Sequence, residues 1–192
     1  MSLSELSPQT LSSHQQLEAL SLVRSAVVRW ITDEIRIAPD SGSSLNRVQS
    51  AAFVTLTLQD SLRGCIGALE PREPLGATLV ECAISAACKD PRFPPVTRDE
   101  LAKVCFEISA LTVPRLLAGP EGIVVGRDGV LVEIAGRRGL LLPQVAARFN
   151  WDPATFLDHA CLKAGFKAGD WRRGARLWTF QAQVFSEASP AA

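Results

Sequence analysis

The sequence lacks an excess of either charge and lacks a long apolar run. Its 20 lysine and arginine residues balance 20 aspartate and glutamate residues, so no overall field draws the chain to nucleic acid or to an anionic membrane. No uninterrupted apolar stretch approaches the roughly 20 residues that a membrane-spanning helix requires. We therefore expect no membrane association and no general nucleic-acid binding.

The chain also lacks the marks of export. Residues 1–16 are rich in serine and have neither the basic start nor the apolar core of a signal peptide, which predicts a cytoplasmic protein. Five cysteines cannot all pair within one chain, and cytoplasmic thiols are kept reduced. We therefore expect no disulfide framework among Cys65, Cys82, Cys88, Cys105 and Cys161.

Metal ligands and general bases are scarce. The sequence has no Cys-x-x-Cys pair, no pair of histidines at helical spacing and no cluster of carboxylates. Residues 126–129 indicate a hairpin turn and lack the following helix of a phosphate-binding loop. We expect neither a metal site nor a bound cofactor. The two histidines, His14 and His159, are interpreted as surface residues rather than bases.

What the sequence does contain is enough apolar material for a core. With 192 residues, 47% of them hydrophobic, the chain can fold as one domain or as two closely packed subdomains. A capping box at Ser13 and Gln16 precedes apolar residues at helical spacing, and alternation of apolar residues with threonine predicts strands. In the first half of the chain, the expected elements are a helix over about 13–35, strands over 51–58 and 62–69, a helix over 74–89 and a strand over 104–112. The second face of this last strand is unusually polar.

The second half indicates a β-meander, a helix and a last strand. Short strands are expected over 123–125, 130–135 and 140–142. Asp152 can cap, and Pro153 can open, a helix that ends near Gly165, and a last strand spans 177–185. Together the elements predict an α+β fold of two closely packed subdomains with mainly antiparallel strands and flanking helices. We expect one domain over 12–185, with flexible termini at 1–11 and 186–192.

Two glycines flank a cysteine in the segment Leu62-Arg63-Gly64-Cys65-Ile66-Gly67, inside an expected strand. Glycine weakens a strand and often marks a bulge or the close approach of another backbone or a ligand. A guanidinium near the sulfur would favour the thiolate, which makes Cys65 a candidate nucleophile assisted by Arg63. The alternative is a structural cysteine, the commoner case, with Gly64 and Gly67 present for packing alone.

A second candidate segment is Asp90-Pro91-Arg92-Phe93-Pro94-Pro95, which must leave the helix because three prolines in five residues prevent continued backbone bonding. The prolines stiffen the segment, which suits a fixed charge. We expect it beside the Cys65 strand, with Arg92 paired to Asp90 or Glu107. The alternative is that Arg92 is solvated.

Several segments occur in a specific order along the chain: Leu62-Arg63-Gly64-Cys65-Ile66-Gly67, Pro74-Leu75, Asp90-Pro91-Arg92-Phe93-Pro94-Pro95, Glu107-Ile108-Ser109, Leu142-Pro143-Gln144-Val145, Trp151-Asp152 and Lys163-Ala164-Gly165. Together they resemble the AMMECR-one domain family, whose prokaryotic members are also called AmmeMemoRadiSam system protein A. The resemblance runs from the first helix to Phe185 and covers nearly the whole chain.

The resemblance implies an α+β fold of two subdomains but no assigned reaction. The family's name implies two partners in a shared modification pathway, a Memo-like protein and a radical S-adenosylmethionine (SAM) protein. That implication is an analogy rather than chemistry. The hexapeptide from Leu62 to Gly67 is the hallmark of the family, so the resemblance implies that it has a role beyond packing. The resemblance also singles out residues elsewhere in the chain. The candidate catalytic residues are Cys65 and Arg63, and the candidate binding residues are Gly64, Gly67, Asp90, Arg92, Phe93, Glu107 and Lys163.

One departure from the family bears on mechanism. Many relatives carry histidine where Asp128 precedes Gly129, so no imidazole base is available from that turn. Two functions are therefore carried forward. The first is an enzyme or enzyme subunit acting on a small molecule or nucleotide-derived group, with Cys65 as nucleophile and Arg63 or Arg92 binding an anion. The second is a non-catalytic module that binds pathway partners.

Overall fold

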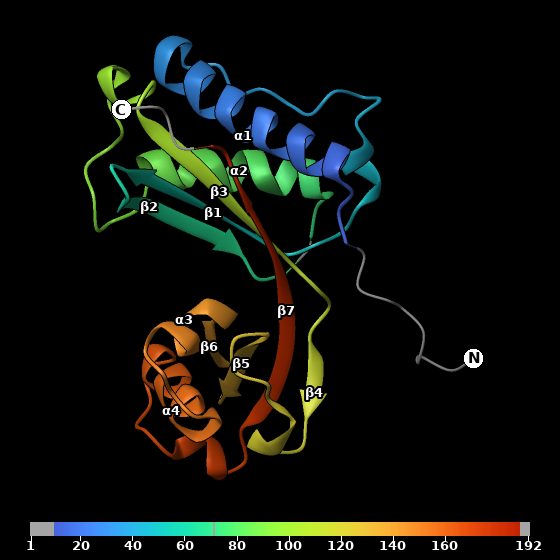
Figure 1. Cartoon of the computed structure of the whole chain (residues 1–192), viewed down its shortest axis with the longest axis vertical. Helices are drawn as coiled ribbons and strands as arrows, with labels where there is room; N and C mark the ends of the chain where they lie inside the picture. Colours follow the sequence, from blue (N-terminus) through green and yellow to red (C-terminus); the bar gives the residue numbers. More distant parts are fainter. Residues whose placement is uncertain (1–9, 71, 189–192) are drawn as a thin grey trace. The chain divides into compact units, whose positions relative to one another are not determined.

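A computed structural model describes residues 10–70 and 72–188, so most of the two termini that we expected to be flexible lie outside the described residues. The chain divides into two compact units. The first comprises residues up to 110 and from 183 onward, and the second comprises residues 111–182. Within the described residues, none of the helices is long and apolar enough to cross a membrane. The α+β class is confirmed, with helices packed on antiparallel strands in each unit (Figure 1).

The first unit is built on a three-stranded antiparallel sheet in the order β2-β1-β3. The strands are β1 (Ala52–Leu58), β2 (Ser61–Ala68) and β3 (Val104–Leu111). Helix α2 (Leu75–Cys88) lies against β1 and β2, and α1 (Ser13–Asp33) packs against α2 (Figure 1). Both helices therefore cover the same face of the sheet, and the core lies between them and that face.

Alternation along the strands separates this apolar face from a polar one, because successive side chains of a strand point to opposite faces. On β1, Val54 and Leu56 are completely buried, whereas Thr55 is only half-buried. On β3, Phe106 and Ile108 are buried in the core. The face away from the helices carries the residues that alternate with these: Phe53, Thr55 and Thr57 on β1, and Cys105, Glu107 and Ser109 on β3.

The second unit has antiparallel strands in the order β4-β7-β5-β6. They are β4 (Arg115–Leu117), β5 (Asp128–Ile134), β6 (Arg137–Leu141) and β7 (Arg176–Ser186), whose last residues belong to the first unit. Two helices, α3 (Pro143–Arg148) and α4 (Pro153–Lys163), complete it. Phe156 and Leu157 of α4 are fully buried with Val130 and Val132 of β5.

Several boundaries differ from those that the sequence predicts. The capping box of α1 joins Ser12 to Gln15, one residue before the predicted pair. The predicted strand over 123–125 was wrong, because the Val124 amide donates to the Asp128 side chain across a turn instead of pairing with a strand. Helix α3 and strand β4 were not predicted, because six and three residues are too short to show periodicity. The short 3-10 helices are η1 (Ser44–Arg47), η2 (Arg98–Glu100), η3 (Pro120–Gly122) and η4 (Asp170–Arg172).

Candidate functional site

Cys65 lies on the polar face of the first unit, in a row of three residues that crosses the sheet. Thr55 of β1 stands directly opposite Cys65 of β2 on one side and opposite Glu107 of β3 on the other. The Thr55 hydroxyl donates to the Cys65 sulfur, with Oγ1 and Sγ 3.3 Å apart. Cys65 is half-buried. The register therefore brings a thiol, a hydroxyl and a carboxyl group together from three separate strands.

Arg63, two residues before Cys65, is occupied by other partners. Its Nε and Nη2 donate to the two carboxylate oxygens of Glu100, at 2.8 and 3.0 Å. Its Nη1 and Nη2 donate to the carbonyls of Pro94 and Pro95. These bonds use four of the five N–H donors of the guanidinium. The bond from Arg63 lowers the pKa of the Glu100 carboxyl to about 2, and the side chain of Arg63 is 11% exposed. Arg63 thus ties β2 to the proline-rich segment.

Asp90 and Arg92 bind the free edge of β2 at Cys65. The Cys65 amide donates to Asp90 Oδ2 at 2.9 Å, and Arg92 Nη2 donates to the Cys65 carbonyl at 3.3 Å. The pair thereby satisfies backbone groups that an edge strand would otherwise leave unpaired. Arg92 also donates to both Asp90 oxygens, at 2.9 and 2.6 Å. These bonds hold the pKa of Asp90 well below its usual range, although burial opposes the shift.

The exposures of this pair differ sharply. The Asp90 side chain is 2% exposed and that of Arg92 is 53% exposed, so the carboxylate is internal while the guanidinium faces solvent. The hydrogen bonds to Asp90 raise the pKa of Arg92 against the cost of its partial burial, and attraction to Asp90 and Cys65 adds to the shift. Arg92 pairs with Asp90 rather than Glu107, one of the two partners expected for it. The ring of Phe93 lies beneath its guanidinium at 5.5 Å.

Packing accounts for glycine at positions 64 and 67. A Cβ on Gly64 would lie 2.1 Å from the Ala86 carbonyl oxygen of α2, which is closer than real atoms approach. A Cβ on Gly67 would lie 2.2 Å from the ring of Phe53, its cross-strand neighbour. Glycine at these positions allows the helix and the aromatic ring to lie directly on the strand.

Two polar groups on β3 have no partner in the part of the chain that the structure describes. Burial raises the pKa of Glu107, and no hydrogen bond or ion pair to its carboxyl group occurs within residues 10–70 and 72–188. Ser109, two residues further along the same face, is 1% exposed, and its Oγ has no partner among those residues either. The sequence did not single out Thr55 as a site residue, because the register that places it opposite Cys65 is not visible in the sequence. It did not single out Ser109 either, because the near-complete burial of this residue is seen only in the structure.

The remaining candidates lie elsewhere. Lys163 is exposed at the end of α4, in the second unit. His159 of the same helix stacks on Trp151, with ring centroids 3.7 Å apart. His14 is exposed in the first turn of α1. Neither histidine belongs to the row formed by Cys65, Thr55 and Glu107.

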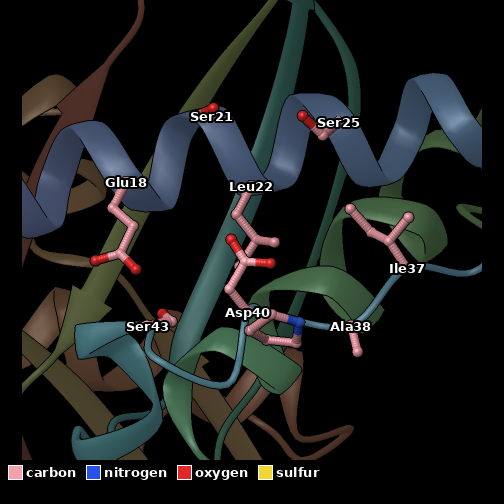
Figure 2. Close-up of a pocket in the computed structure, with 9 residues that line it drawn as sticks. Glu18, Ser21, Leu22, Ser25, Ile37, Ala38, Asp40 and Ser43 are labelled. Carbon is pink, nitrogen blue, oxygen red and sulfur yellow. The ribbon is translucent and has the colours of Figure 1, made fainter.

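A cavity of about 250 Å³ lies in the first unit between α1 and residues 37–43. Figure 2 shows the Glu18 and Asp40 side chains with the hydroxyls of Ser21 and Ser25 around it. Hydrogen bonds from Ser43 and Ser44 lower the pKa of Glu18. None of the residues that the sequence singled out lines this cavity, so it is separate from the Cys65 row.

Comparison with known proteins decides the family. The model of the AMMECR1 family matches residues 20–185. The chain belongs to the AMMECR1 family. Among its AMMECR1 relatives, a protein of Thermofilum pendens is 43% identical over 94% of this chain and 93% of its own length. A protein of Methanocaldococcus jannaschii is 41% identical over 90% of both chains.

A solved structure confirms the fold. The crystal structure of an uncharacterized protein from Pyrococcus horikoshii superposes with a TM-score of 0.88 at 34% identity, covering 94% of this chain and 95% of that one. AMMECR1 membership therefore agrees with the fold described above.

Proposed function

We propose that this protein is a thiol-dependent enzyme, or the subunit of one, that binds a small anionic molecule on the polar face of the first unit. Cys65 is the nucleophile, Thr55 holds its sulfur in place, and Arg92 binds the anion. Glu107 binds a polar group of the same molecule. The observation that carries the proposal is the row of Cys65, Thr55 and Glu107, in which a half-buried carboxyl group faces the same surface as the thiol and has no partner among the described residues.

The assignment of the anion to Arg92 rather than Arg63 follows from their hydrogen bonds. Arg63 donates its hydrogen bonds to Glu100 and to two backbone carbonyls. Arg92 binds Asp90 and the Cys65 carbonyl through Nε and Nη2, and no hydrogen bond from its Nη1 occurs in the described part of the chain. A half-exposed guanidinium with a free donor edge is well suited to a carboxylate or phosphate. Arg63 then acts as a positioning residue.

The mechanism uses no cysteine–histidine pair. In the attack, the thiolate sulfur forms a bond to an electrophilic carbon of the substrate, and a leaving group departs with the electron pair of the broken bond. The thiol proton passes to solvent before attack, and the sulfur is intrinsically a strong nucleophile. This proposal retains the implication that the protein acts in a cytoplasmic modification pathway with a Memo-like protein and a radical SAM protein. Copurification of the three proteins tests that implication.

Selective alkylation tests the nucleophile. We expect brief treatment of the native protein with substoichiometric iodoacetamide to label Cys65 before any other thiol. Burial raises the pKa of Cys82 to about 11 and also raises the pKa of Cys88 and Cys161, so these thiols should react slowly. Peptide mass mapping gives the order of labelling. Preferential labelling of any other thiol, the half-buried Cys105 included, would remove the argument for a functional thiol.

One set of contacts favours a non-catalytic binding module instead. Arg63, Gly64 and Gly67 each have a structural contact that accounts for the residue type: Glu100, the Ala86 carbonyl and the Phe53 ring. The Cys65 backbone is likewise held by Asp90. A module of this kind needs the hexapeptide for folding and does not need the thiol. If Cys65→Ser leaves function in the intact pathway unchanged, the binding module is correct and the enzyme is not.

A further inference from the structure

The polar face of the first unit has an unusual charge arrangement, with a guanidinium at one end of the Cys65 row and a carboxyl group at the other. Glu107 has no partner among the described residues, and the Oγ of Ser109 beside it has none either. Buried polar groups are paired in the great majority of cases, and an unpaired one calls for a ligand or an ordered water. Two such groups on one strand face point to a ligand that donates hydrogen bonds.

The two groups are placed to share one donor. Residues i and i+2 of a strand lie on the same face, about 7 Å apart at Cα, so the Glu107 carboxyl and the Ser109 hydroxyl can approach a common point. An ammonium group has three N–H donors and can bond both. Its positive charge also offsets the cost of a half-buried carboxylate, which a neutral donor does not. The β3 end of the row is therefore suited to an amine.

The opposite end is suited to an anion. Arg92 is anchored to Asp90 and to the Cys65 carbonyl at the free edge of β2. Adjacent strands are about 4.8 Å apart, and β1 separates β2 from β3. The Cys65 and Glu107 strands are thus roughly 10 Å apart, and Arg92 lies at or beyond the Cys65 end. A ligand that reaches both ends has its opposite charges about 10 Å apart or slightly more.

We propose that the substrate of this face is a small, extended aminocarboxylate or aminophosphate, whose anion binds Arg92, whose amino group binds Glu107 and Ser109, and whose middle portion passes over Cys65. The inference rests on the proposed function for the location of the site and adds the class of substrate. It also gives each end of the ligand a separate protein partner, so each end can be tested independently.

Terminal aminooctanoate is a suitable probe because it carries a carboxylate and an ammonium group about 10 Å apart when extended. Octanoate lacks the amine, octylamine lacks the acid, and aminobutanoate is too short. Titration calorimetry is carried out on the Cys65→Ala protein, so that reaction of the thiol plays no part. We expect aminooctanoate to bind at least about tenfold more tightly than each of the three controls, which is the value of one charged hydrogen bond.

Variants assign the two ends. Glu107→Gln should remove the preference of aminooctanoate over octanoate, lowering that affinity ratio by about tenfold or more. Glu73→Gln, which neutralises an exposed carboxylate, should leave the ratio unchanged. Arg92→Gln should remove the preference over octylamine. Because each result is a ratio of two ligands on one protein, a general loss of stability does not imitate it.

Two outcomes overturn the inference. One is equal affinity of the Cys65→Ala protein for aminooctanoate and octanoate, and the other is a preference that survives Glu107→Gln. These results are distinct from failure of the proposed function. If Cys65 is not the most reactive thiol but the Cys65→Ala protein binds aminooctanoate as expected, the substrate class stands and the nucleophile is wrong. If Cys65 labels first and aminooctanoate does not bind, the nucleophile stands and the substrate class is wrong.

Discussion

At the scale of single residues, Cys65 is held on two sides of one strand. The backbone of Cys65 is bound by Asp90 and Arg92 at the edge of β2, and its sulfur is bound by Thr55 on the sheet face. A change at Asp90 or Arg92 therefore acts on Cys65 through the backbone, while a change at Thr55 acts on the sulfur directly. Stability and thiol reactivity can be measured separately.

Replacing Arg92 by alanine should lower the free energy of unfolding by about 2 kcal/mol. Removing one partner of a buried ion pair costs roughly 3–5 kcal/mol. The loss is smaller here because Arg92 is half-exposed and two backbone amides still donate to Asp90. Urea denaturation gives the value. Arg36→Ala, which breaks an exposed pair with Glu81, is the control and should cost under about 1 kcal/mol. Equal losses in the two variants would show that Arg92 is an ordinary surface arginine.

Replacing Glu107 by glutamine should stabilise the free protein at neutral pH. Burial raises the pKa of Glu107 above its ordinary value of 4.5, so the folded state binds its proton more tightly than the unfolded state does. Ionisation therefore costs stability above the raised pKa, and the cost disappears below pH 4.5. The difference between variant and wild type should be positive at pH 7 and should vanish near pH 4. Thermal unfolding across this range measures it, and a difference independent of pH would contradict it.

At the scale of elements, the contact between α2 and β2 places the candidate site. Ala86 of α2 approaches Gly64 so closely that no side chain fits between them. The helix ends two residues later at Cys88, and the proline-rich segment that follows then reaches the edge of β2 with Asp90. The position of Asp90 and Arg92 beside Cys65 thus depends on the close helix–strand contact at Gly64.

Replacing Gly64 by alanine should lower the free energy of unfolding by about 2 kcal/mol, within the range for overpacking a close contact. It should also raise the labelling rate of Cys65, because the bonds from Asp90 and Arg92 are displaced. Gly42→Ala is the matched control, since a Cβ at Gly42 meets nothing within 4 Å, and its stability should be unchanged or slightly higher. Urea denaturation and iodoacetamide kinetics give the two readouts. An unchanged Gly64→Ala protein would show that helix and strand separate without cost.

The sequence predicted most helices and strands well, and it predicted the contacts between them poorly. Alternation identified the strands and the polar face of β3, and the proline-rich segment was expected beside Cys65. The partner of Arg63 was not predicted, because Glu100 lies 37 residues away and a local pattern gives no register. For the same reason, Thr55 was not selected from the sequence, and Ser109 was not selected because its burial is seen only in the structure. The glycines of the hexapeptide indicated a close approach, but only the folded structure identifies Ala86 and Phe53 as the neighbours.

At the scale of the whole molecule, the chain leaves the first unit after β3 and returns to it at the end of β7. Glu187 fixes that return, because it accepts two hydrogen bonds from Arg24 and one from the Phe106 amide. The Cys65 row and the Asp90–Arg92 pair belong entirely to the first unit, whereas Lys163 and His159 belong to the second. The thiol and the groups proposed to act with it therefore all come from one unit.

The central claim, that Arg92 binds an anion beside a reactive Cys65, is tested most directly by comparing two alkylating reagents. Iodoacetate and iodoacetamide share an electrophilic carbon and differ in charge. We predict that the ratio of the iodoacetate rate to the iodoacetamide rate is several-fold higher at Cys65 than at Cys105, another half-buried thiol. Arg92→Gln should abolish the difference, and Arg36→Gln should preserve it. An equal ratio at the two thiols, or one that survives Arg92→Gln, would contradict the claim.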